Sequence, residues 1–569
     1  MSHRLSRNEY AGYYGPTAGD KIRLGDTALV AEVERDCTVP GDENIYAGMR
    51  SLRDTMGLGA SADDALDSVV VNVVIIDWTG IYKADIGIKN GRIAGIGKAG
   101  NPQIMAGVTP GLTIGAATEI ICGEGRIATA GGIDANIALV SARQAEAALA
   151  GGVTTLMGGG SGFAQDFESA TGTPGARRIE TLMHATDDLP LNFGFYAKAG
   201  SQQPDSLIQQ VLAGAAGLSL HEFSGVGAAA LETCLGLSIQ FDLPVALRPD
   251  PLSEAGGFDA VMKALNGRPA CYQLNLGAGG LSAQDGLKVC GETRALPMSM
   301  GSARPGSINT LDEQRELLFA RRRMDRNNST DVAFAETSLL ASSFAAEDLL
   351  HDMGAIPAIS SGGMASGRPG DMIARAWRTA HKMSQQRGRL KGEHGANDNV
   401  RIRRYIAKYT INPALMCGIS HEVGSLENAK LADIVLWKPA FFGIKPECII
   451  KGGIAVWGQS GAPSGAIALV QPVASRATLC GASGASAHTS MVFVSKHSLR
   501  QNALTNYNLR KKVAPVRGWR SVSKAEMRLN DATPKISIDA KRHHVIADGE
   551  ALICEPAENL PLAQRYALF

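Results

Sequence analysis

The sequence predicts an α/β protein made of a (β/α)8 TIM-like barrel and a discontinuous small β domain. Three observations predict this fold class. Strand-like text rich in β-branched residues stands near the N-terminus, a long alternation of apolar strands and helical patterns follows, and strand-like text then returns. At 569 residues the chain is too long for one hydrophobic core, so we expect several packed units.

The first part of the β domain is predicted from residues 68–97, which read SVVVNVVIIDWTGIYKADIGIKNGRIAGIG. Its β-branched runs are interrupted at residues 78–80 (Trp-Thr-Gly) and again by Asn90 and Gly91, a pair typical of two-residue hairpin turns. We therefore assign residues 1–130 to the N-terminal part of a composite β domain.

The barrel is predicted from the change of rhythm that begins at residue 131. A helical pattern at 142–150 leads through two glycines into strand-like text at 153–157, and repeats of such a unit imply a parallel sheet with crossover helices. The alternation continues to residue 424, a span of roughly 290 residues, which is near the typical size of an eight-stranded barrel. We assign residues 131–424 to the barrel.

The remainder of the chain is predicted to complete the β domain and then to form a separate C-terminal segment. Residues 431–437 (LADIVLW) and 448–456 are strand-like, so we assign 425–471 to the second part of the composite domain. Residues 472–569 are predicted to form a C-terminal segment with a loose loop and satellite elements.

Composition excludes several classes of function. Hydrophobic residues make up 45%, charged residues 20%, and the net charge is +1, so neither nucleic acid nor a membrane surface is an expected partner. No apolar run approaches the roughly 20 residues that span a bilayer. The nine cysteines are scattered without a C-x-x-C pair and are interpreted as reduced thiols. We expect a cytoplasmic protein.

Several long strings resemble the urease alpha (large) subunit family of metal-dependent amidohydrolases. The strings are YGPTAGDKIRLGDT at 14–27, KADIGIKNGRIAGIGKAGNP at 83–102, RYIAKYTINPA at 404–414, GISHEVGSLENAKLADIVLWKPAFFGIKPE at 418–447, and LPLAQRYALF at the end. The resemblance implies a metal site at the C-terminal ends of the barrel strands. In that family two nickel ions, bridged by a carbamylated lysine and held by four histidines and an aspartate, activate urea and water.

The resemblance also implies where those six ligands belong, and this chain has another residue type at each position. The six positions lie in the strings GGIDANIAL, GLSLHE, VALRPD, CYQLNLGAGG and ISSG, and hold Asn136, Ala138, Ser219, Arg248, Leu274 and Gly362. An amide is a weak nickel ligand, serine has no amine to carry a carbamate, and arginine is a fixed cation. We therefore expect no nickel and no other cofactor.

The mobile flap of the family is altered in the same direction. Residues 321–323 are all arginine where the family has Cys-His-His, so Arg322 occupies the position of the catalytic acid, and Ser338 occupies that of its supporting arginine. His221 keeps the position that contacts substrate in the family. Without a metal beside it, a histidine at a strand end is more often a hydrogen-bonded core residue, and this is the alternative interpretation of His221.

Two charged features leave alternatives open. Arg248 either forms an internal pair with Asp134, Glu222 or Asp250, which would replace part of the lost cationic charge, or extends to solvent. The arginines at 321–323 either bind an anion or acidic partner at the barrel mouth, or form a solvated helix face.

The sequence therefore predicts a urease alpha-like protein that does not hydrolyse urea and has a structural or regulatory role. The alternatives are an active urease that forms ammonia and carbamate or CO2, and an amidohydrolase-fold enzyme of another specificity. The resemblance implies separate urease beta and gamma subunits as partners, and an oligomer based on a homotrimer.

Overall fold

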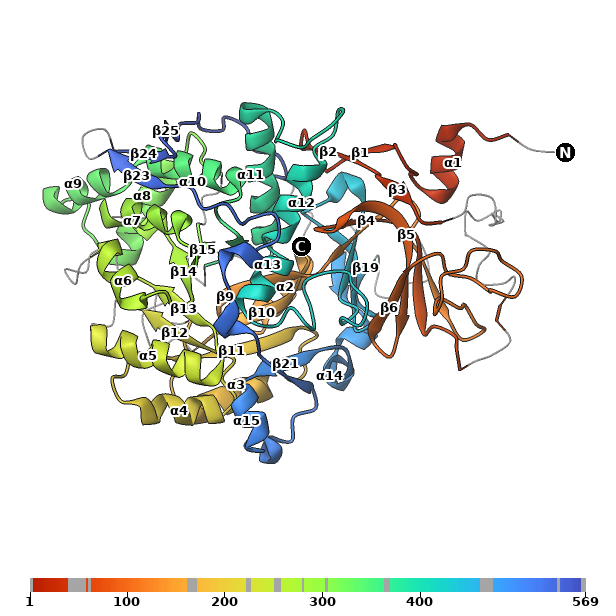
Figure 1. Ribbon diagram of the computed structural model, residues 1–569, viewed down its shortest axis with the longest axis horizontal. Helices are drawn as coiled ribbons and strands as arrows, with labels where there is room; N and C mark the ends of the chain where they lie inside the picture. Colours follow the sequence, from red (N-terminus) through yellow and green to blue (C-terminus); the bar gives the residue numbers. More distant parts are fainter. Residues whose placement is uncertain are drawn as a thin grey trace.

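Eight parallel strands form a nearly closed barrel, on the left in Figure 1. The computed structural model describes residues 4–38, 58–59, 63–160, 171–221, 227–249, 257–278, 281–301, 305–362, 369–460, 474–539 and 543–563. The barrel strands are β9 (Gly132–Ala138), β10 (Val153–Gly159), β11 (Asn192–Lys198), β12 (Gly217–His221), β13 (Val245–Arg248), β14 (Ala270–Leu274), β15 (Ala295–Ser299) and β16 (Ala358–Ile359). They are paired in chain order, so the predicted barrel is confirmed.

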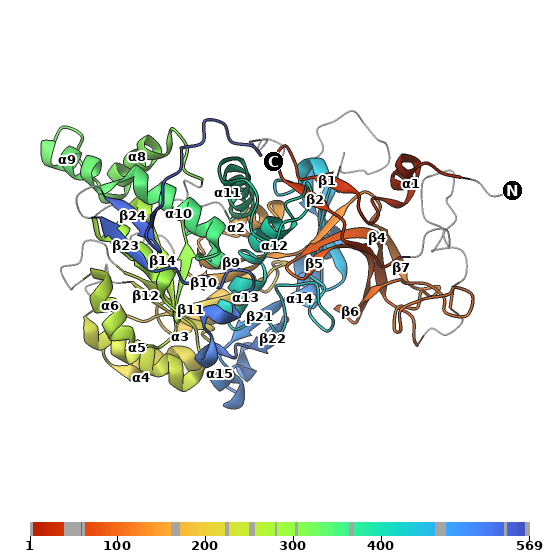
Figure 2. The same ribbon diagram turned by 45° about the horizontal axis from the view of Figure 1, so that its top comes forward.

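Helices connect the strands and cover the outside of the barrel (Figures 1 and 2). They are α2 (Arg143–Ala150), α3 (Ala176–Thr186), α4 (Pro204–Leu212), α5 (Ala228–Phe241), α6 (Gly257–Leu265), α7 (Leu281–Asp285), α8 (Thr310–Arg322), α9 (Ser329–Ser338), α10 (Ala341–Met353), α11 (Asp371–Arg387), α12 (Asn399–Ala407) and α13 (Ile411–Met416). No helix of the described ranges is both long and apolar enough to cross a membrane.

A second sheet combines strands from both sides of the barrel sequence. Figure 1 shows the early strands β4 and β5 on the same side of the molecule as the much later β19, and the three belong to one sheet. Its strands are β3 (Arg35–Asp36), β4 (Ser68–Asp77), β5 (Gly80–Lys89), β6 (Arg92–Gly97), β7 (Glu119–Cys122), β8 (Ile127–Ala130), β17 (Ile434–Trp437), β18 (Pro446–Lys451), β19 (Ile454–Ser460) and β20 (Ala474–Ala477). The β domain is therefore discontinuous in sequence.

The hairpin between β5 and β6 forms where the sequence predicted it. Lys89 pairs with Arg92, and the two residues between them have positive φ, +54° at Asn90 and +75° at Gly91. A type I′ turn needs positive φ at both of its central residues, and asparagine followed by glycine supplies it with little strain. This prediction is confirmed.

The remaining elements flank the two main sheets. They are α1 (Arg7–Tyr14), β1 (Lys21–Arg23), β2 (Val30–Glu32), α14 (Ser486–Thr489), β21 (Met491–Val494), α15 (Lys496–Arg500), β22 (Lys512–Pro515), β23 (Ile536–Asp539), β24 (His544–Ala547) and β25 (Glu550–Ala551). One of them, β21, pairs in parallel with barrel strand β11 and with β22, so the C-terminal segment is built into the barrel sheet.

The two main bodies meet near the N-terminal ends of the barrel strands. Trp377, Trp437 and Phe442 pack together there, with ring centroids 4.9 and 5.6 Å from the Phe442 ring. Asn192, the first residue of β11, donates a hydrogen bond of 2.8 Å to Asp433, which precedes β17. The candidate site lies at the opposite, C-terminal ends of the strands, where barrel enzymes carry their active sites.

Candidate functional site

The barrel brings the predicted site residues to the C-terminal ends of its strands. Asn136 and Ala138 end β9, Ser219 and His221 end β12, Arg248 ends β13, Leu274 ends β14, and Gly362 follows β16 by three residues. Apart from Gly362, none of these residues is more than 7% exposed. Because the strands run in parallel, these ends lie on one face of the barrel.

Thr171, from the loop after β10, connects the two polar residues of β12. Its Oγ1 lies 3.1 Å from Ser219 Oγ and 2.8 Å from His221 Nε2, and all three residues are buried. Two residues further on, the Thr173 backbone N–H donates to the Tyr196 carbonyl of β11. A hydrogen-bonded chain therefore runs from Ser219 through Thr171 to His221.

Two cations lie near His221. Arg248 is its partner in the register of β12 and β13, and Lys198 at the end of β11 is the register partner of Ser219. Burial, together with the positive charges of Arg248 and Lys198, lowers the pKa of His221 from 6.5 to about 3. The imidazole is therefore neutral at physiological pH.

A separate polar group joins β9 to the end of β16. Asp134 Oδ1 accepts hydrogen bonds from the Ser360 hydroxyl at 2.6 Å and from the Ser361 backbone N–H at 3.2 Å. The other oxygen, Oδ2, is buried and has no hydrogen-bond partner. Asp134 is thus not the partner of Arg248, and that alternative is wrong.

The other two acids considered for Arg248, Glu222 and Asp250, lie outside the described residues, as does the side chain of Arg321.

The side chains at the ligand positions of β9 and β16 have other neighbours. Asn136 donates from Nδ2 to the Met300 sulfur at 3.5 Å, while its Oδ1 is buried without a hydrogen-bond partner. Gly362 has φ +78°, and a Cβ at this position would lie 2.7 Å from the Met300 carbonyl oxygen. The backbone at 362 therefore accommodates glycine and strains any other residue.

The two flap positions lie on helices outside the barrel strands. Arg322 ends α8, and its guanidinium lies 5.6 Å from the Phe334 ring centroid of α9. Ser338 ends α9 and is 7% exposed. Arg323 follows α8, is exposed and has φ +51°. Arg322 is thus directed at α9, and Arg323 at solvent.

Metal-ligand side chains do not converge within the described ranges: no group of three or more His, Cys, Asp or Glu residues there could hold a metal ion. Two other histidines of the barrel region lie on helices and not at strand ends. His351 is buried in α10, and His381 of α11 accepts the backbone N–H of Ala28 at 3.0 Å.

Sequence reasoning missed two residues of this site. Lys198 could have been found, because it is the last residue of a barrel strand, as His221 and Arg248 are. Thr171 could not, because it lies in a loop whose sequence has no periodic pattern and its partners are 48 and 50 residues away.

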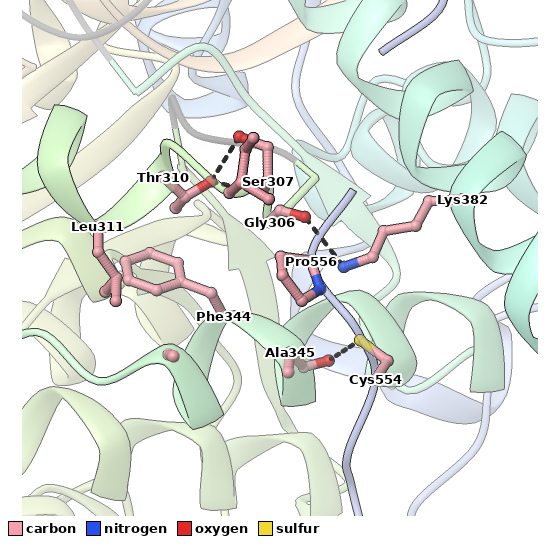
Figure 3. A pocket seen from close by; sticks show the side chains of 11 residues that line it. Gly306, Ser307, Thr310, Leu311, Phe344, Ala345, Lys382, Cys554 and Pro556 are labelled. Atoms are coloured by element: carbon pink, nitrogen blue, oxygen red, sulfur yellow. Dashed lines mark hydrogen bonds between the residues drawn. The ribbon is translucent and has the colours of Figure 1, made fainter. Parts of the chain in front are cut away.

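A cavity of about 130 Å³ lies between α8, α10, α11 and the C-terminal segment (Figure 3). Its lining is mainly apolar. The Lys382 ammonium donates to the Gly306 carbonyl at 3.1 Å and to Asp348 at 2.8 Å, and both charged side chains are buried. Burial raises the pKa of the Cys554 thiol at its edge. This cavity contains none of the predicted site residues.

Comparison with known proteins finds solved structures and families that resemble this chain. The solved structures similar to this chain include a D-hydantoinase, with 15% identity, TM-score 0.47, and coverage of 69% of this chain and 95% of that one. A dihydropyrimidinase from Brevibacillus agri has 12% identity, TM-score 0.47 and coverage of 68% and 94%. An N-acyl-D-glutamate deacylase from Bordetella bronchiseptica has 15% identity, TM-score 0.45 and coverage of 69% and 95%.

Two protein families match the sequence itself. Residues 3–121 match the N-terminal domain of the urease alpha-subunit, and residues 127–466 match the amidohydrolase family. The second match covers more than half of the chain and includes all the barrel strands. The chain, urease alpha-like in its N-terminal domain, belongs to the amidohydrolase family.

Proposed function

We propose that this protein is a urease alpha-like protein that does not hydrolyse urea and that serves as a structural or regulatory component of an assembly. One observation carries the proposal: the barrel strand ends, where the family carries its metal site, hold an amide, a hydroxyl, a guanidinium and apolar side chains in place of metal ligands.

The side chains at the six positions do not fit a pair of nickel ions. Ser219 offers a hydroxyl, which already contacts Thr171, in place of the amine that a bridging carbamate needs. Arg248 would place a fixed positive charge beside two divalent cations, and the Asn136 amide nitrogen contacts a sulfur. Nickel prefers imidazole nitrogen to the hydroxyl, guanidinium and amide groups present here, and several ligands must act together to bind it.

The backbone at Gly362 supports the same conclusion. An aspartate here would need a Cβ only 2.7 Å from the Met300 carbonyl oxygen, at a φ of +78°. Restoring the missing carboxylate therefore requires the backbone to move as well as the side chain to change.

The remaining groups do not replace the reaction. His221 is neutral, with a pKa of about 3, so near neutral pH it has no acidic imidazolium proton to give to a leaving amine. Its imidazole hydrogen-bonds Thr171, which orients the ring. Urea is a poor electrophile, and these contacts provide neither an activated water nor a strong electrophile to act on it.

We extend the proposal to assembly with separate urease beta and gamma subunits in a trimer-based oligomer. Its support is the family-like sequence outside the strand ends, including the whole match over residues 3–121. Co-expression with tagged beta and gamma subunits, followed by size-exclusion chromatography, tests this part: co-elution supports it, and elution of this chain alone contradicts it.

The central test measures nickel by inductively coupled plasma mass spectrometry and ammonia release from urea on the same sample. The protein is co-expressed with nickel and urease accessory proteins, and an active urease produced identically serves as the positive control. We expect fewer than about 0.1 nickel ions per chain and no ammonia above the background, since loss of even one outer-shell partner of a metal ligand typically costs about 10 to 100-fold in affinity. Stoichiometric nickel with ammonia release would overturn the proposal.

A further inference from the structure

The cavity of about 130 Å³ in Figure 3 is formed by segments that lie far apart in the sequence. Its lining comes from the stretch 306–311 around the start of α8, from 341–345 at the start of α10, from Lys382 of α11 and from the stretch 554–556. All of the lining residues belong to the described ranges. A molecule bound here would therefore contact three helices and the C-terminal segment at once.

The polar groups of the cavity wall already bind one another. The Lys382 ammonium donates to the Gly306 carbonyl at 3.1 Å and to Asp348 at 2.8 Å, so its positive charge is neutralised. The Thr310 hydroxyl accepts the Ser307 backbone N–H at 2.7 Å. Within the described residues, no buried side-chain nitrogen or oxygen of this lining lacks a hydrogen-bond partner. Because an ordered water needs two to four polar partners, the cavity favours an apolar occupant.

Gly306 enlarges the cavity because it has no side chain. Its φ lies outside the left-handed region, so the backbone does not require glycine. A Cβ here would lie 3.4 Å from Asp348 Oδ2, 3.6 Å from Phe344 Cβ and 3.7 Å from Lys382 Nζ, which are ordinary contact distances. Phe344 and Lys382 line the cavity, so the missing side chain leaves space within it. Since protein interiors contain few voids larger than a water molecule, this space calls for an occupant.

The cavity has a mouth through which a small molecule can enter. Ile308, at its edge, is 58% exposed, and the lining residues Ala341 and Pro556 are exposed as well. Phe344, by contrast, is only 8% exposed and forms the inner part of the wall. A ligand can therefore reach the apolar interior of the cavity without unfolding of the helices around it.

We propose that this cavity binds a small uncharged apolar molecule, with a single aromatic ring or a short branched alkyl chain. A dry apolar cavity of about 150 Å³ accommodates benzene, so a volume of about 130 Å³ suits a molecule of about six carbon atoms. The neutralised Lys382 gives no preference for an ion. The inference is independent of the proposed function, because none of the six ligand positions lines the cavity.

The test is saturation-transfer difference NMR of benzene in the presence of the full-length protein. We expect the benzene signal to receive saturation from the protein, with an amplitude that reaches a plateau as benzene is added and so gives a Kd. Benzoate has the same ring with a negative charge and should bind more weakly, because an apolar wall does not compensate a desolvated carboxylate. Absence of benzene binding would overturn the proposal, and benzoate binding as tight as that of benzene would contradict the uncharged class.

The thiol of Cys554 reports whether benzene occupies this cavity. It is partly exposed at the cavity edge and donates to the Ala345 carbonyl at 3.5 Å. With benzene at about four times its Kd, alkylation of Cys554 by iodoacetamide should slow about 5-fold, which is the factor 1 + [L]/Kd. Peptide mass mapping of the same sample follows Cys480, which is exposed, lies outside the lining and should react at an unchanged rate. An unchanged rate at Cys554 would overturn the assignment to this cavity.

Variants that fill the cavity provide the second localisation. Gly306→Leu should weaken benzene binding about 10-fold or more, because the added side chain takes up the space and a close-packed core resists further insertion. Gly236→Leu adds the same side chain on α5, where nothing lies within 4 Å of a Cβ, and should leave binding unchanged. Gly306→Ala, whose Cβ fits at contact distance, should weaken binding less and provides the result if the leucine variant fails to fold. Equal affinity in all three variants would refute the proposal.

Discussion

Replacing Thr171 with valine should destabilise the barrel by about 2–6 kcal/mol. Valine has almost the same shape as threonine, so the change removes the hydroxyl without leaving a cavity. Ser219 Oγ and His221 Nε2 would each lose a contact, of 3.1 and 2.8 Å respectively, at positions that are 3% and 7% exposed. Each buried polar group left without a partner costs about 1–3 kcal/mol, and two such groups give the expected sum.

The assay is urea-induced unfolding followed by circular dichroism, with the shift in the midpoint converted by the m-value that the variants share. Thr171→Ser is the matched control. It retains the hydroxyl and loses one buried methyl group, so it should cost about 1 kcal/mol. A valine variant no less stable than the serine variant would refute the idea that Thr171 holds Ser219 and His221.

Three other changes test separate parts of the structure. His221 has a pKa of about 3 in the folded protein and 6.5 in the unfolded chain, so the unfolded chain binds more protons between these values. The free energy of unfolding should therefore fall by up to about 1.4 kcal/mol per unit as the pH drops from 6.5 towards 3. His221→Asn should flatten this slope in urea titrations. Arg401→Met should cost about 3 kcal/mol in thermal unfolding, because Asp352 would stay buried with its bonds to this guanidinium lost. Gly158→Ala should cost about 1–3 kcal/mol or more by the same assay, since its Cβ would lie 2.0 Å from the Ile137 carbonyl oxygen.

Each of these changes has a control or a contradicting result. An unaltered pH slope in the His221 variant would show that this imidazole does not cause it. Arg326→Ala breaks an exposed pair with Glu316 and should cost less than about 1 kcal/mol, so a larger loss would contradict the role of burial at Arg401. Gly236→Ala, in α5 with open space around it, should stabilise by about 0.5–1 kcal/mol.

The sequence was sufficient to predict the elements whose signal is local. The strand-like text at 153–157 became β10, and Asn90 with Gly91 formed the hairpin turn. A short apolar, β-branched run and a turn that needs positive φ depend on a few adjacent residues, so they can be recognised without a structure. The positions of the candidate site, by contrast, came from the resemblance to the urease alpha-subunit family, and the structure places most of them at strand ends.

Contacts between distant segments could not be predicted in this way. The strand β21 pairs with β11 from roughly 300 residues further along the chain, although its sequence, MVFV, contains no sign of its partner. Thr171 reaches Ser219 and His221 from a loop for the same reason: hydrogen-bond partners are chosen by tertiary packing, which local patterns do not encode. The exclusion of Asp134 as the partner of Arg248 likewise needed the structure.

The discontinuous sheet has a consequence for the nascent chain. Strand β8 ends at Ala130, whereas its antiparallel neighbour β17 begins only at Ile434. A ribosome that adds about 5–20 residues per second needs about 15–60 s to make the intervening stretch. Throughout that interval one edge of β8 exposes unpaired N–H and C=O groups, which can pair with a neighbouring nascent chain on the same messenger. The yield of folded protein in the cell will therefore depend on translation speed and on chaperones that cover this edge.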